Sequence, residues 1–451
     1  MDPLVLISMV LAIVVIKRQS LNDAVIKVYL PSLLIIPEFY SVRLPHLPPI
    51  GFAAAAIIPI GFVMFKNHLR DWKVQRADFW LALFVLGATY SELIRDGSSD
   101  AVFMLVEQIF SVVLPYAIGK LLLEQDGIRE RFARQFVLLL AVVAILSLWE
   151  FRMGTNLFTT IIGMFFPAHH AWLMQIRGGW IRVAGPYASC ILAGVIFLAG
   201  WILSMWVSYV DKISGTDKKY WFGLRRSLLL PLILFAGLIM AQSRGPWIGA
   251  ALAFVVARIG KAKNVRRTAI VTICFCCIAG GIGYSYANRY TDGSMAEAKT
   301  IEQENAIYRR QLLDNYKPII EQGGLFGWGS VDFPKVPGQN SIDNEFLLLQ
   351  ITQGKVGFWT YVLLGIESII AVFMAARRAT QRVDLYFALS LGGILAGILL
   401  SLSTVYMGAQ TGPLFFLFVG WSQSLRQTQT FTAAAPQAVP TARFAFRRVF
   451  A

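Results

Sequence analysis

The sequence predicts an all-α polytopic integral membrane protein with about 12–13 transmembrane helices and a large outer loop late in the chain. Of its 451 residues, 56% are hydrophobic. Only 15% are charged, against roughly 25% in an average soluble protein. The apolar residues also come in long runs, which a soluble domain could not bury. These observations exclude a soluble enzyme, a disordered chain and a secreted disulfide-rich scaffold.

The individual spans follow from the length of the apolar runs. A helix needs ~20 apolar residues to cross the hydrocarbon layer of a bilayer. The first and ninth predicted spans are short. The predicted spans lie near residues 3–16, 24–40, 48–65, 78–95, 101–119, 135–151, 185–208, 227–242, 246–258, 268–286, 346–376, 384–401 and 405–424.

The distribution of basic residues predicts the orientation. Most of the 41 Lys and Arg residues fall in the loops that share one side of this map, and such loops are usually cytoplasmic. The net charge of +15 therefore reflects topology and does not indicate nucleic-acid binding. We expect one transmembrane domain over residues 1–426 with outer loops 152–184 and 288–345. Residues 427–451 are expected to form a disordered cytoplasmic tail.

The residues that commonly bind metals give no pattern here. The four cysteines lie in apolar runs without the spacing of a zinc site, and we expect them to be small buried hydrophobes. His169 and His170 lack cysteine or acidic neighbours. No phosphate-binding or dinucleotide-binding glycine motif is present. The sequence therefore predicts no metal and no cofactor.

Two predicted helix starts on the outer side carry an arginine. The first reads Arg182-Val-Ala-Gly-Pro-Tyr-Ala-Ser, and Pro186 suits the first turn of the seventh span. The second reads Gln242-Ser-Arg-Gly-Pro-Trp, in which Ser243 can cap and Pro246 suits the first turn. Helix N-termini attract anions, and arginine suits bidentate phosphate contact. A phosphate-bearing ligand is one interpretation, and arginines that extend to lipid headgroups are the other.

A third helix start reads Ser341-Ile-Asp-Asn-Glu-Phe-Leu-Leu-Leu. Asp343 or Asn344 can cap this helix, and Glu345 lies in its first turn. Simple capping by Asp343 is the alternative to a catalytic role for its carboxylate.

Four stretches in this order resemble the bacterial O-antigen ligase and polysaccharide polymerase superfamily. They are Arg182-Val-Ala-Gly-Pro; Gln242-Ser-Arg-Gly; Tyr308-Arg-Arg-Gln-Leu-Leu with Gly324-Leu-Phe-Gly-Trp-Gly; and Asp343-Asn-Glu-Phe-Leu with Gly354 and Gly357. The resemblance covers roughly residues 180 to 360. It differs from the family pattern at Gly324, where a proline is usual, and at Asp343, where ligases typically carry a histidine.

The resemblance implies a multi-pass protein of the bacterial inner membrane, with the large loop in the periplasm and the C-terminus in the cytoplasm. It implies a metal-independent glycosyltransferase whose donor is a glycan on polyprenyl diphosphate. The acceptor is a glycan or lipid A core, and other polysaccharide assembly proteins are further partners. Under this resemblance Arg182, Arg244, Arg309 and Arg310 bind the diphosphate, and Asp343, Glu345 and Asn344 are the catalytic candidates.

Three alternatives remain open from the sequence. The absence of a histidine between residues 288 and 345 favours a polymerase over a ligase. A transporter for a lipid or an anionic solute is the competing class, although charged residues are rare within the predicted spans. The third alternative is a non-catalytic subunit of a polysaccharide assembly complex.

Overall fold

The computed structural model describes residues 2–45, 47–125, 127–166, 174–215, 220–221, 224–293, 295–339, 341–408 and 410–427. It confirms the all-α membrane fold. Among the described residues, eight helices are long and apolar enough to cross a membrane. The helices are α1 (Leu6–Arg18), α2 (Leu21–Ala24), α3 (Leu30–Ile35), α4 (Phe52–His68), α5 (Arg76–Arg95), α6 (Ser98–Gln108), α7 (Leu114–Leu121), α8 (Ile128–Met153), α9 (Leu157–Gly163), α10 (Cys190–Ile213), α11 (Arg226–Met240), α12 (Arg244–Ile259), α13 (Val265–Tyr290), α14 (Ile301–Gly323), α15 (Glu345–Thr352), α16 (Gly354–Arg378), α17 (Arg382–Leu402) and α18 (Thr411–Gln427).

Each predicted span overlaps helical segments of the structure, and the spans at 24–40, 101–119 and 346–376 each cover more than one segment. Two spans contain a single π-type turn, at Val25–Tyr29 between α2 and α3 and at Ile109–Val113 between α6 and α7. The strands form three short antiparallel hairpins, which all lie in loops. The strands are β1 (Ser41–Val42), β2 (Ile50–Gly51), β3 (Gln175–Arg177), β4 (Trp180–Arg182), β5 (Tyr220–Trp221) and β6 (Leu224–Arg225).

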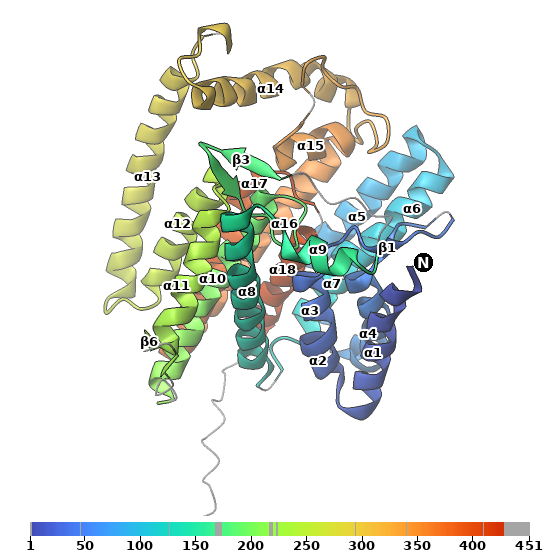
Figure 1. The fold of residues 1–451 in the computed structure, drawn as a ribbon, viewed down its shortest axis with the longest axis vertical. Coiled ribbons are helices and arrows are strands. Elements are labelled where there is room, and N and C mark those ends of the chain that lie inside the picture. Colours follow the sequence, from blue (N-terminus) through green and yellow to red (C-terminus); the bar gives the residue numbers. More distant parts are fainter. Residues whose placement is uncertain are drawn as a thin grey trace, which may run out of the picture.

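The loops gather at two ends of the bundle, as the alternating topology requires. The α14 end carries the N-terminus, the β3–β4 hairpin, α9, α14 and α15, whereas the β5–β6 hairpin lies at the opposite end (Figure 1). We call the opposite end the basic end, because most of the loop arginines and lysines lie there. The predicted C-terminal tail from residue 428 onward lies outside the described residues, as do His169 and His170.

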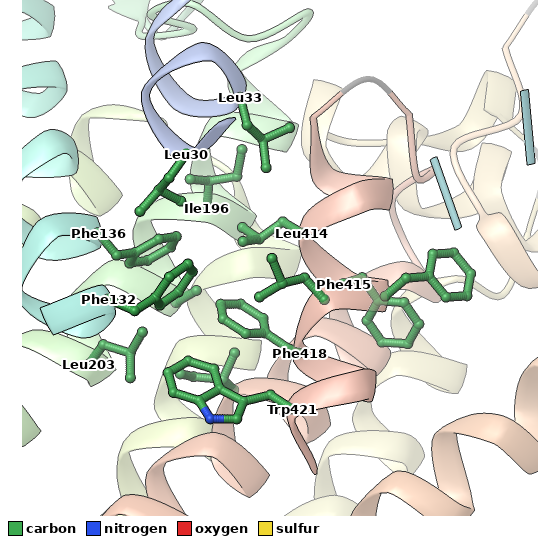
Figure 2. Packing of buried hydrophobic residues seen from close by; sticks show 14 of the residues in the cluster. Leu30, Leu33, Phe132, Phe136, Ile196, Leu203, Leu414, Phe415, Phe418 and Trp421 are labelled. Carbon is green, nitrogen blue, oxygen red and sulfur yellow. The ribbon is translucent and has the colours of Figure 1, made fainter. Parts of the chain in front are cut away.

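The core is a continuous aliphatic and aromatic cluster that runs through the bundle. Phe132 and Phe136 of α8 face Phe418 and Trp421 of α18 (Figure 2). The rings of Phe132 and Trp421 make an edge contact with centroids 5.3 Å apart, a geometry that aromatic pairs favour. Leu203 of α10 packs in the same layer, so that the C-terminal helix lies in the centre of the bundle.

Small residues bring α12 and α17 into backbone contact. Gly249 lies against the Gly397 carbonyl, and Gly393 lies against Ala253. A Cβ on any of these glycines would collide with the backbone of the other helix. Spacing of small residues four apart is the usual means of close helix packing in membranes. The start of α12 is thereby fixed on a rigid pair of helices.

Buried ion pairs join the helices at the basic end. Arg129 bonds both Glu124 and Asp384, and its contact with Asp384 is 2.6 Å long. Glu124 also accepts a hydrogen bond of 2.6 Å from the Trp421 indole. These bonds connect α8, α17 and α18. Both carboxylates contact the Arg129 guanidinium, so neither is buried without a positive partner.

The predicted span at 346–376 is wrong in one respect, because the structure divides it into α15 and α16. Gly354 at the break has a φ of +64°. The carbonyls of Ile351 and Thr352 accept hydrogen bonds of 2.9 and 3.0 Å from the amides of Trp328 and Gly329. Amides of the loop after α14 thus bond the last carbonyls of α15, and the chain changes direction at Gly354 before α16 begins.

The seventh span also begins later than predicted. The structure starts α10 at Cys190, with the Ser189 side chain as its N-cap. Pro186 therefore precedes the helix and lies in a turn, where Gly185 has a φ of +59°. The extended backbone of Ser189, with a φ of −156° and a ψ of 160°, keeps the helix from extending back to Pro186.

The prediction that all four cysteines are buried holds only for Cys190. Cys274 and Cys277 are exposed on α13, and Cys276 is intermediate. In the figure α13 stands apart from the bundle at its outer edge, and none of its residues is buried (Figure 1). Its side chains are therefore available to lipid.

Candidate functional site

The candidate site lies at the α14 end, where four separate segments meet. These segments are the β3–β4 hairpin, the turn before α12, the underside of α14 and the chain just before α15. In Figure 1, β3 lies above α10 and α12, and α14 runs across the top of the bundle. We call Arg177, Arg182, Arg244 and Arg309 the arginine cluster.

The β3–β4 hairpin supplies two of these arginines. Arg182 pairs with Gln175 across the hairpin, and its Nη1 donates a 2.9 Å hydrogen bond to the Gln175 Oε1 atom. The Nη1 atom of Arg177 donates to the Gln242 carbonyl at 2.8 Å. Gly178 and Gly179 both have positive φ and form the tight turn between the strands. The hairpin thereby holds two guanidinium groups on one side of the bundle.

Gln242 is the one non-glycine residue with positive φ in the described part of the chain, at +47°. Its carbonyl accepts the bond from Arg177, and its own Nε2 donates to the Ile181 carbonyl at 3.2 Å. A left-handed conformation costs roughly 1–2 kcal/mol for a residue with a side chain. Such strain persists where surrounding bonds enforce it, and this often happens at functional sites.

The turn at Gln242 leads directly into Arg244, the first residue of α12. Ser243 occupies the N-cap position as predicted, but its side chain makes no capping hydrogen bond. Pro246 lies in the first turn, also as predicted. Arg244 is half-exposed and lies 3.7 Å from Glu302 at the start of α14. The contact with Glu302 brings Arg244 under the N-terminal part of α14.

Arg309 and Arg310 point in different directions from α14. Arg309 shares its helix face with Leu312 and Tyr316, at a spacing of three and seven residues. Those two residues are buried against α15, so Arg309 faces the bundle. Arg310 instead donates to the carboxylate of Asp292 at 2.8 Å. The structure therefore assembles Arg309, and not Arg310, with the other arginines.

The three candidates at the start of α15 have different surroundings. Asp343 is partly exposed and accepts a 2.7 Å hydrogen bond from the Ser341 hydroxyl. Asn344 is the N-cap of α15, and its side chain accepts from the Leu347 amide at 3.1 Å. Glu345 is buried and accepts the Met407 amide at 2.7 Å. Asp343 is thus the candidate that remains accessible to a ligand.

Electrostatic interactions connect Asp343 with the arginine cluster. Arg182 interacts with the charges of Arg177, Arg309 and Asp343, and Arg309 interacts with Asp343, Arg177 and Arg244. Desolvation lowers the pKa of Arg182 and of Arg309, and neighbouring arginines lower both further. Asp343 opposes this effect at both positions. Four guanidinium groups against two carboxylates, Asp343 and Glu302, leave a net positive site, which a bound anion would stabilise.

A cavity of about 200 Å³ adjoins the cluster at Arg182. It lies between the ends of α8 and α9, the hairpin and the start of α10. The cavity is lined by Glu150, Gly154, Asn156, Thr159, Met174, Gln175, Arg182, Ala184, Tyr187, Ala188, Ser189 and Cys190.

Sequence reasoning does not single out two residues of this site. Arg177 lies within the predicted outer loop 152–184, and no motif distinguishes it from other loop arginines. Tyr406 follows α17 and hydrogen-bonds Ser189, close to the charge of Asp343. The positive charge of Arg177 was visible in the sequence, but its proximity to Arg309 depends on how the loops fold together.

Residues 229–362 match the family model described as O-antigen ligase. The matched stretch contains Arg244, Arg309 and Asp343, whereas Arg177 and Arg182 lie before it. The comparison with curated proteins gives no match.

Proposed function

We propose that this chain is a member of the O-antigen ligase and polysaccharide polymerase superfamily, whose ligase model matches residues 229–362, and that it transfers a glycan from polyprenyl diphosphate to an acceptor hydroxyl. The family match supports the assignment of this chain as a multi-pass bacterial membrane enzyme that processes glycans. In the proposal, the protein lies in the inner membrane with the α14 end in the periplasm and the C-terminus in the cytoplasm.

The arginine cluster is the observation that carries the proposal. A diphosphate bears several negative oxygens, and guanidinium groups bind such oxygens through paired hydrogen bonds. Desolvation first, and neighbouring arginines second, lower the pKa of Arg182 and of Arg309, so an added negative charge at this site would be favourable. A diphosphate would supply that charge, and the arginines would stabilise the charge that grows on the leaving group. The cluster would perform this role without a metal ion.

The proposed reaction is a single displacement at the anomeric carbon of the donor. The acceptor oxygen forms a bond to this carbon, the bond from the carbon to the phosphate oxygen breaks, and polyprenyl diphosphate leaves. The acceptor proton passes to a base, for which Asp343 is the accessible carboxylate. Burial raises the pKa of Glu345 to about 7, a suitable value for a base. Because its oxygen accepts the Met407 amide, however, we assign Glu345 a positioning role.

Three single substitutions test the arginine cluster, and Arg310 provides a matched control. Arg182→Ala, Arg244→Ala and Arg309→Ala should each abolish polymer while the protein level stays normal. Arg310→Ala changes the neighbouring residue on the same helix and should retain polymer. Surface glycan on a gel and protein in the membrane fraction are the two measurements. Normal polymer in all three cluster variants would refute the diphosphate site.

A deletion in the native host distinguishes a polymerase from a ligase. We favour the polymerase, because Asp343 stands where ligases of the superfamily typically carry a histidine. Single repeat units on lipid A without a ladder would support the polymerase. Polymer retained on the polyprenyl carrier with bare lipid A core would support the ligase, and an unchanged glycan profile would support a transporter.

A further inference from the structure

The cavity beside the arginine cluster is built from rigidly held groups. Both carboxylate oxygens of Glu150 accept backbone hydrogen bonds, from Ala184 at 3.0 Å and from Gly185 at 2.8 Å. The Asn156 amide donates to the Gly185 carbonyl at 2.6 Å. These bonds fix the chain that runs from the hairpin into α10. The cavity therefore has a defined shape before any ligand binds.

The charges in its wall argue against an anion as the occupant. Glu150 is the acidic residue that lines the cavity, and both of its oxygens already accept backbone hydrogen bonds. A phosphate group inside the cavity would face this carboxylate. Arg182 is the positively charged residue among the lining residues. One charge of each sign in the wall favours a neutral, polar ligand.

The remaining wall groups match a ligand with hydroxyl groups and an apolar ring face. Side chains that hydrogen-bond readily come from Thr159, Gln175 and Ser189, and apolar surface comes from Met174 and Ala188. The hydroxyls of Thr159 and Ser189 and the amide of Gln175 can each exchange hydrogen bonds with the hydroxyl groups of a sugar.

The position of the cavity indicates which sugar would bind. Arg182 belongs both to the cavity wall and to the arginine cluster. Ser189 belongs to the wall and bonds Tyr406, which lies near the charge of Asp343. A ring in the cavity would thus lie between the diphosphate and the carboxylate. A volume of about 200 Å³ is below the range of drug-sized pockets and suits a single ring.

We propose that this cavity binds the sugar that is attached directly to the diphosphate of the donor. This inference rests on the proposed function, because the arginine cluster must hold the diphosphate. The bound ring then presents its anomeric carbon toward Asp343, and the wall selects the donor by its first sugar.

Two adjacent threonines on α9 provide the test. The hydroxyls of Thr159 and Thr160 both donate to the Asn156 carbonyl, at 3.0 and 2.9 Å. Thr159 lines the cavity, whereas Thr160 is exposed. Thr159→Trp fills the cavity, and Thr160→Trp makes the same chemical change outside it. The full-length protein in nanodiscs is titrated with undecaprenyl diphosphate, bare or carrying one hexose or one N-acetylhexosamine.

The expected result separates sugar recognition from diphosphate recognition. The wild type should bind at least one sugar-bearing lipid about tenfold more tightly than the bare lipid, as two or three new hydrogen bonds would give. Thr159→Trp should remove this preference and leave the Kd of the bare lipid within about twofold. Thr160→Trp should behave as the wild type. The unchanged Kd of the bare lipid shows that each variant is folded.

Each remaining outcome overturns a particular claim. Equal binding of bare and sugar-bearing lipids by the wild type overturns the sugar cavity and leaves the diphosphate site standing. A preference that survives in Thr159→Trp also overturns the cavity. Failure of the wild type to bind the bare lipid overturns the proposed function, and the sugar cavity with it.

Discussion

The loop that follows α14 is held against α5 by a few buried bonds, and Ser91 is central among them. Its hydroxyl lies 2.5 Å from the Phe326 carbonyl and 2.7 Å from the Thr352 carbonyl. Arg95 donates to the Gly327 carbonyl at 2.9 Å, and Glu92 accepts the Ser330 amide at 2.8 Å. This loop joins α14 to the chain that carries Asp343. We therefore predict that Ser91→Ala loosens the attachment of the candidate site.

The size of the effect follows from the burial of Ser91, which is 0% exposed. Its removal leaves the Phe326 carbonyl without this donor, and an unsatisfied buried group costs about 1–3 kcal/mol. If the free energy of local opening falls by this amount, amide exchange at residues 326–330 should accelerate about 5- to 150-fold. Hydrogen–deuterium exchange with mass spectrometry measures this rate, and glycan transfer should fall with it.

Ser147→Ala is the matched control for this experiment. Ser147 is also 0% exposed, but its hydroxyl has no hydrogen-bond partner among the described residues. The same change there should leave exchange at residues 326–330 unaltered. Exchange that stays within about twofold of the wild type in Ser91→Ala would refute the reasoning, because the serine would then contribute nothing to the attachment.

Three further predictions concern other parts of the molecule. Gly249→Leu should collide with α17 and cost about 1–3 kcal/mol or more, seen as a lower Tm in detergent. Gly280→Leu on α13 meets open space, and an equal loss of Tm there would contradict the packing argument. Glu345 has its pKa raised by burial from 4.5 to about 7, so the folded state binds the extra proton and stability should fall as pH rises through this window. Glu345→Gln should abolish that slope in Tm, and a slope that persists would assign it to another group. Maleimide should label Cys277 in the detergent-solubilised protein much faster than Cys190, and equal rates would contradict the exposure of α13.

The spans of this protein could be predicted from the sequence because lipid imposes a local requirement. Each crossing segment must be apolar and must satisfy its own backbone hydrogen bonds. The apolar runs that form α8 and α17 can therefore be recognised as membrane spans from their own residues alone. Helix ends were less predictable. The break at Gly354 depends on the amides of Trp328 and Gly329, which come from a distant loop.

The candidate site was only partly visible in the sequence. Arg182, Arg244 and Arg309 could be proposed because each lies in a short motif on one predicted side. Arg177 has no such motif, and its role depends on its bond to the Gln242 carbonyl. Likewise, Arg309 and Arg310 are adjacent in the chain, and the rotation of α14 against α15 selects between them.

The sequence by itself determined the membrane class, the positions of the helices and the side of the bundle on which the motif arginines lie. Hydropathy and charge act residue by residue, so composition along the chain is sufficient for these features. The tertiary structure alone decided that four arginines from three separate segments interact electrostatically, with Asp343 near Arg182 and Arg309, and that a cavity opens next to Arg182. Such proximity arises from the packing of loops and helices far apart in the chain, and no local pattern encodes it.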